Sequence, residues 1–96
     1  MNILDRLLGR QKRTSITITR EIDAQIAGLE DARKRVQDAK AARQAALDAF
    51  DNGALKSAAD AQAEAERDVE LREYAITQLR AAHVEQVDVE DREEFR

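Results

Sequence analysis

The feature that most constrains the fold is a row of residues spaced alternately three and four positions apart in the second half of the chain. Residues with this spacing lie along one side of an α-helix and form the seam of a coiled coil. Because the row continues for about four heptads, we expect a long helix that packs against another helix. The row consists of Leu55, Ala58, Gln62, Ala65, Val69, Arg72, Ile76, Leu79 and His83.

A second apolar stripe precedes this row and predicts the partner helix within the same chain. We expect the first helix to begin after Thr19, which can act as its N-cap. The turn is predicted at residues 51–53, where Gly53 can adopt the left-handed conformation that follows many helices. The stripe consists of Ile22, Ile26, Leu29, Val36, Leu47 and Phe50.

Folding the chain at this turn brings the two stripes together in one register. Val36 then faces Val69, and Leu29 faces Ile76. Near the turn, the same register places Phe50 opposite Leu55. This agreement between separate segments favours an antiparallel pair over either helix alone. The predicted fold is therefore all-α, a long, coiled-coil-like and Ala-rich hairpin of two helices over residues 20–83.

The composition supports this fold class. Charged residues make up 38% of the chain, and there is no Pro, Cys or Trp. Abundant Ala, Glu, Arg, Asp and Leu are typical of long helices and coiled coils rather than of a domain that encloses a ligand pocket. Without Cys, the chain can form neither a disulfide nor a thiolate metal site.

Two segments that flank the hairpin alternate with a period of two, which is typical of strands. Residues 13–19 alternate Ile16 and Ile18 with polar residues, and Val87 and Val89 alternate with acids. The hairpin would bring these segments together, so we predict a small antiparallel β-ribbon of residues 14–19 and 84–90. The alternative is an extended basic linker and a disordered acidic tail over residues 84–96.

Residues 1–12 form a predicted docking segment. A short helix there would place four apolar residues on one face, namely Ile3, Leu4, Leu7 and Leu8. About ten residues do not form a stable isolated helix in water. We therefore expect this segment to bind a partner groove or a neighbouring copy; a membrane surface and a frayed end are the alternatives.

The sequence shows no arrangement of residues typical of catalysis. His83 is the sole histidine and has no evident catalytic partner, and the acidic tail lacks the spacing of a calcium loop. We therefore expect neither an enzyme nor a cofactor. Nucleic acid is not expected because the net charge is −4 and the basic stretch is short. A membrane is not expected because no apolar run is long enough to span one.

Apolar residues outside the predicted seam favour association with other proteins. Leu71 and Tyr74 are the largest of these on the second helix, and Ile16, Ile18, Val87 and Val89 could join subunits at the ribbon. We predict a structural or assembly protein that forms homo-oligomers or joins a larger assembly. A tailed-phage virion component, such as a head, neck or tail accessory protein, fits this description, with a virion or cytoplasmic location. The alternative is a small soluble adaptor or chaperone that binds a client through its N-terminal helix.

Overall fold

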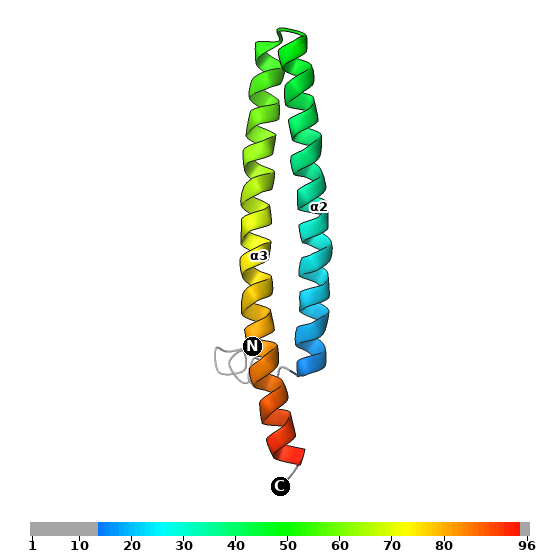
Figure 1. Ribbon diagram of the computed structural model, residues 1–96, viewed down its shortest axis with the longest axis vertical. Coiled ribbons are helices and arrows are strands. Elements are labelled where there is room, and N and C mark those ends of the chain that lie inside the picture. The colour runs from blue at the N-terminus through cyan, green and yellow to red at the C-terminus, as the bar shows by residue number, and fades with distance from the viewer. Residues whose placement is uncertain (1–13, 95–96) are drawn as a thin grey trace, which may run out of the picture.

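The structure is a computed structural model that describes residues 14–94, with side chains described for residues 14–90. Two helices, α2 (Ser15–Asp48) and α3 (Asn52–Glu94), run antiparallel and form an elongated hairpin (Figure 1). The molecule extends 69 Å along its longest axis. The predicted all-α hairpin is confirmed. The predicted short N-terminal helix lies outside the described residues.

Helix α2 begins earlier in the chain than predicted. Its N-cap is Thr14, whose Oγ1 accepts a hydrogen bond of 3.1 Å from the backbone N–H of Thr17. Thr19, the predicted cap, lies inside the helix and donates its hydroxyl to the carbonyl oxygen of Ser15 at 2.8 Å. A threonine side chain at the N-cap satisfies one of the N–H groups that have no partner within the helix, so Thr14 defines the helix start.

The predicted β-ribbon of residues 14–19 and 84–90 is wrong, because residues 15–19 belong to α2 and residues 84–90 to α3. No strand occurs anywhere in residues 14–94. The alternative of an extended linker and a disordered tail is also wrong for residues 15–19 and 84–94. β-Branched residues cost only tenths of a kcal/mol each in a helix. A two-stranded ribbon, in contrast, is marginal in water.

The hairpin tip is built by residues 49–51, two positions before the predicted turn at 51–53. Phe50 adopts the left-handed conformation, with φ of 56°. The N–H of Asp51 donates to the Ala46 carbonyl at 2.9 Å and that of Phe50 to the Leu47 carbonyl at 3.1 Å. This pair of bonds is the Schellman motif that closes helices. The predicted left-handed residue, Gly53, instead lies inside α3 without a positive φ.

Asp51 also begins the second helix. Its Oδ1 accepts a hydrogen bond of 3.0 Å from the N–H of Ala54, and its carbonyl oxygen accepts one of 2.9 Å from the N–H of Leu55. Aspartate is one of the preferred N-cap residues because its carboxylate satisfies a free N–H and favours the positive helix end. Asp51 therefore takes part in the C-terminal cap of α2 and is also the N-cap of α3, so the connection between the two helices is very short.

The core is the seam between α2 and α3. Its buried apolar residues are Ile18, Leu29, Ala32, Val36, Ala39, Ala46, Ala58, Ala65 and Ile76. Leu29, Val36 and Ile76 are buried as the predicted register requires. Leu47 and Phe50, however, are 48% and 96% exposed, so the seam near the tip is formed by alanines and not by the predicted large residues.

Candidate interaction surfaces

The predicted partner-binding residues fall into three groups in the structure. Ile3, Leu4, Leu7 and Leu8 lie outside the described residues. Ile18 is 2% exposed and forms part of the seam, and Val87 is half-buried. Ile16, Leu71, Tyr74 and Val89 are exposed. Within residues 14–90, the members of this set therefore do not gather into one surface.

Leu71 and Tyr74 form one apolar patch on α3. They are three residues apart, and side chains at this spacing are neighbours on a helix surface. Their exposed fractions are 66% and 65%. Val84, which the sequence analysis did not select, is 62% exposed further along the same helix. The Leu71–Tyr74 pair is thus available for contacts with another molecule.

The hairpin tip is a second apolar surface. Leu47, Phe50 and Leu55 line a shallow hollow of about 240 Å³ together with Ala46, Asp51 and Asn52. Phe50 is almost fully exposed, although its side chain is one of the largest apolar groups in the chain. A left-handed backbone is costly for residues other than glycine, so this position combines backbone strain with an exposed aromatic ring.

A shallow groove of about 480 Å³ lies between the helices near the middle of the rod. Val36 and Val69 provide its apolar part, and Arg33, Lys34, Gln37 and Glu66 complete its lining. We call this side of the hairpin the groove face. Arg33 crosses it to form an ion pair of 3.2 Å with Glu73, and both side chains are more than half exposed.

The two rims of the groove face carry opposite charges. Between residues 33 and 40, α2 exposes Arg33, Lys34 and Lys40; the exposed acid Glu30 lies one turn earlier and does not line the groove. Glu66, Glu70 and Glu73 are exposed on α3 and share one side of that helix because of their four- and three-residue spacing. Several of these residues come directly after a residue of the seam, among them Arg33, Lys40, Glu66 and Glu73. The groove face therefore consists of an apolar floor with a basic rim and an acidic rim.

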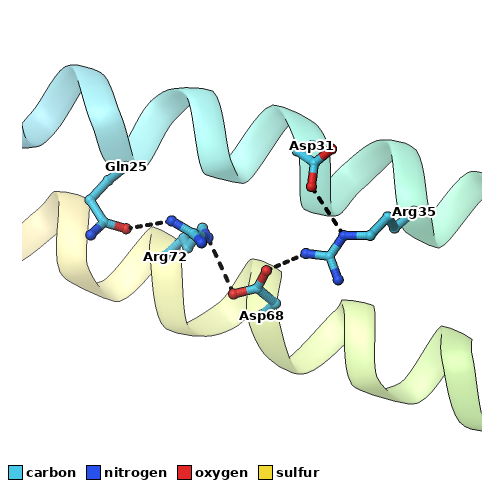
Figure 2. A network of polar contacts seen from close by, with 5 residues as sticks. All are labelled: Gln25, Asp31, Arg35, Asp68 and Arg72. Carbon is cyan, nitrogen blue, oxygen red and sulfur yellow. Dashed lines mark hydrogen bonds and ion pairs between the residues drawn. The ribbon is translucent and has the colours of Figure 1, made fainter.

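The opposite flank of the seam is closed by a polar network (Figure 2). Arg72 donates to Gln25 Oε1 across the helices at 3.2 Å, and its Nε donates to Asp68 at 3.2 Å. Asp68 also accepts a hydrogen bond from Arg35, which reaches across from α2 and donates to Asp31 at 3.2 Å as well. The hydrogen bond to Asp68 raises the pKa of Arg35.

Gly28 makes room for this network. A Cβ at position 28 would lie 2.2 Å from Nη1 of Arg72, which is closer than real Cβ atoms approach a neighbour. The glycine therefore lets the Arg72 guanidinium lie against the backbone of α2. The register in which Val36 faces Val69 would also place two like charges, Arg33 and Arg72, opposite each other. The structure separates them, because Arg33 pairs with Glu73 and Arg72 with Asp68.

At the open end, Glu90 of α3 binds the first residue of α2. Its carboxylate accepts hydrogen bonds from the hydroxyl of Ser15 at 2.8 Å and from the N–H of Ser15 at 3.2 Å. The Ser15 hydroxyl lowers the pKa of Glu90 most, and the Ser15 N–H lowers it further. A carboxylate at a helix N-terminus is favoured by the helix dipole, so Glu90 fixes the register at this end.

Several kinds of site are not found in the described part of the chain. No group of three or more His, Asp or Glu residues there could hold a metal ion. Neither α2 nor α3 is long and apolar enough to cross a membrane. His83 is half-buried in α3.

Comparison with known proteins gives no relative for this chain. No family model, curated protein or solved structure matches it. The groove face and the tip therefore have to be interpreted from their own geometry. Neither surface was predicted from the sequence. The charged rims were detectable over a limited stretch, because the charged residues that follow seam positions are basic in residues 33–40 and acidic in residues 66–73. The exposure of Phe50 depends on the early turn, and no sequence pattern indicates it.

Proposed function

We propose that this chain is a non-enzymatic assembly protein whose rod-shaped hairpin associates with further copies of itself. The observation that carries the proposal is exposed apolar surface on the described residues. Leu71 and Tyr74 form one patch on α3 and are 66% and 65% exposed, and Phe50 at the tip is 96% exposed. Large apolar side chains that gather on a surface mark sites of protein–protein interaction.

The thin core supports the same proposal. Five of the nine buried apolar residues in the described part of the chain are alanines. Burying a large aliphatic side chain contributes about 1.5–3 kcal/mol, whereas a single methyl group contributes far less. Leu71, Tyr74 and Phe50 remain exposed, so covering them by association would stabilise the rod. A virion accessory protein of a tailed phage is the narrower form of this proposal, supported by the composition typical of helical rods.

The test is the molecular mass in solution as a function of concentration. Light scattering coupled to size exclusion should give a multiple of 10.8 kDa at tens of micromolar protein. Leu71→Glu combined with Tyr74→Glu should reduce association beyond the smallest assembly, because both substitutions place charge on an exposed apolar patch. Circular dichroism should show that helicity is retained. A parent protein that is monomeric at all these concentrations would contradict the proposed function.

A further inference from the structure

We propose that the smallest assembly is a twofold pair of hairpins whose groove faces meet, with both tips at the same end of the pair. The partner is thus a second copy of this chain, and α2 of each copy lies against α3 of the other. This inference rests on the proposed self-association and specifies its geometry. It predicts a four-helix arrangement in which the floors formed by Val36 and Val69 cover each other.

Charge selects this arrangement from the two that twofold symmetry allows. With the axis along the rod, α2 of one copy meets α3 of the other and the tips coincide. With the axis across the rod, like helices meet and the tips lie at opposite ends. The basic rim formed by Arg33, Lys34 and Lys40 meets the acidic rim of the second copy in the first arrangement only. Like charges facing each other across an interface suppress the second arrangement.

The basic residues of one copy and the acidic residues of the other also lie at matching positions along the rod. Arg33 and Glu73 lie at one level, because they form an ion pair of 3.2 Å within the chain. The same antiparallel register places Lys40 at the level of Glu66. In the proposed pair, Lys40 of each copy therefore faces Glu66 of the other without a shift along the rod. On the opposite flank, Arg35 and Arg72 both donate to Asp68 within the chain.

The tip gives independent support. Phe50 is 96% exposed and has a φ of 56°, a conformation that costs energy for a residue with a side chain. Coincident tips bring the Phe50 and Leu47 side chains of two copies to the same end, where they can cover each other. Tips at opposite ends would place each Phe50 near the open end of the other copy and far from the second Phe50. Burial of this ring in the pair accounts for an apolar residue at a strained, exposed position.

Distance measurement between tips tests the geometry. The chain has no cysteine, so Asn52→Cys accepts a single spin label at the start of α3. Coincident tips predict a shortest label-to-label distance below about 30 Å, given helix spacings of roughly 8–10 Å. Opposed tips predict about 50 Å from the helical rise per residue. An assembled protein with only the longer distance would overturn this inference and leave the proposed function standing; a monomer would overturn both.

Charge reversal tests the facing rims. Lys40→Glu and Glu66→Lys should each weaken self-association about tenfold, because each creates two like-charge contacts in a twofold pair. Mixing the two variants should restore the affinity, because positions 40 and 66 are then both acidic in one chain and both basic in the other. Within each variant chain the repulsion persists, so the rescue reports contacts between chains.

The matched control lies on the opposite flank. Glu64→Lys makes the same change of charge at an exposed position of α3 outside the acidic rim, and it should leave the affinity unchanged. Failure of the mixture to recover, or equal weakening by Glu64→Lys, would overturn the inference.

Discussion

The two halves of the rod are held together in different ways. In the tip half, residues 37–67, the buried seam consists of Ala39, Ala46, Ala58 and Ala65. In the open half, residues 15–36 and 68–90, larger residues such as Leu29 and Ile76 are buried. Small residues allow two helices to approach closely but bury little area. Large residues bury more area and keep the helices further apart.

Polar contacts between the helices follow the same division. Ser15 binds Glu90, Arg72 binds Gln25 and Arg33 binds Glu73, all in the open half. The tip half contains a buried acceptor, Oε1 of Gln62, that has no hydrogen-bond partner. The open half therefore specifies the register by directional contacts. The tip half depends on the short connection and on close helix approach.

The largest expected effect is the loss of a large seam residue from the open half. Leu29→Ala removes a side chain that is only 7% exposed and should lower the free energy of unfolding by about 2–4 kcal/mol. The matched variant in the tip half is Leu47→Ala, where the side chain is 48% exposed. It should cost less than about 1 kcal/mol. Urea denaturation followed by circular dichroism, at one protein concentration low enough to keep the chain monomeric, measures both. If Leu29→Ala and Leu47→Ala lowered the free energy of unfolding equally, the two halves would not differ as described.

The second prediction concerns close approach in the tip half. Ala65 is 1% exposed, so Ala65→Leu must push the helices apart and should cost about 1–3 kcal/mol. Ala63→Leu makes the same change at an exposed position two residues away and should be nearly neutral. The two variants are compared by the same urea titration. If Ala65→Leu were as stable as the parent protein, the helices would not be closely packed at this level.

The sequence predicted the hairpin because heptad spacing depends only on which residues are apolar. Leu29, Val36 and Ile76 were placed correctly for that reason. The strand prediction failed at Ile16 and Ile18. Over so short a segment, two isoleucines are compatible with the two-residue period of a strand and with the 3.6-residue period of a helix. Ile18 is 2% exposed and lies on the helical seam, and Ile16 is 66% exposed. The continuation from Ile18 to Ile22 and Gln25 was the signal that distinguishes a helix from a strand.

The candidate surfaces were predicted less well than the fold. Leu71 and Tyr74 were identified, since an apolar residue away from the seam is visible in the heptad pattern. The network of Arg72 with Gln25 and Asp68 was not, because it depends on the room that Gly28 leaves. A glycine inside a helix lowers the stability of that helix by about 1 kcal/mol relative to alanine. The presence of Gly28 within the first helix was therefore the available sign of a close contact at this position.

The third prediction removes the unsatisfied acceptor from the tip half. Gln62→Leu replaces a half-buried seam residue whose Oε1 lacks a partner, and it should raise the free energy of unfolding by about 1 kcal/mol. The loss of the hydrogen bond from Gln62 to Glu66, an exposed residue, offsets only a part of this gain. Gln44→Leu, at an exposed position of α2, is the control and should change stability by less than about 0.5 kcal/mol. A destabilised Gln62→Leu variant would show that this layer needs a polar group.

The smallest expected effect lies at the open end, where Glu90 binds Ser15. The pKa of Glu90 is lowered in the folded chain, mainly by the Ser15 hydroxyl and then by the Ser15 N–H. A carboxylate with a lowered pKa stabilises the fold above its unfolded pKa of about 4.3. This stabilisation is lost as the pH falls through the lower folded value. Glu90→Gln should therefore remove acid sensitivity at the open end and leave the tip half unchanged.

Nuclear magnetic resonance titration of the Glu90 carboxyl group measures this contact directly. Ser15→Ala should move the pKa of Glu90 upward toward its ordinary value, because the hydroxyl contributes most to the shift. The shift should not vanish, since the backbone N–H of residue 15 still donates to the carboxylate. Ser57→Ala, at an exposed position near the tip, is the matched control and should leave Glu90 unaffected. A Glu90 pKa that is insensitive to Ser15→Ala would show that directional contacts do not set the register at this end.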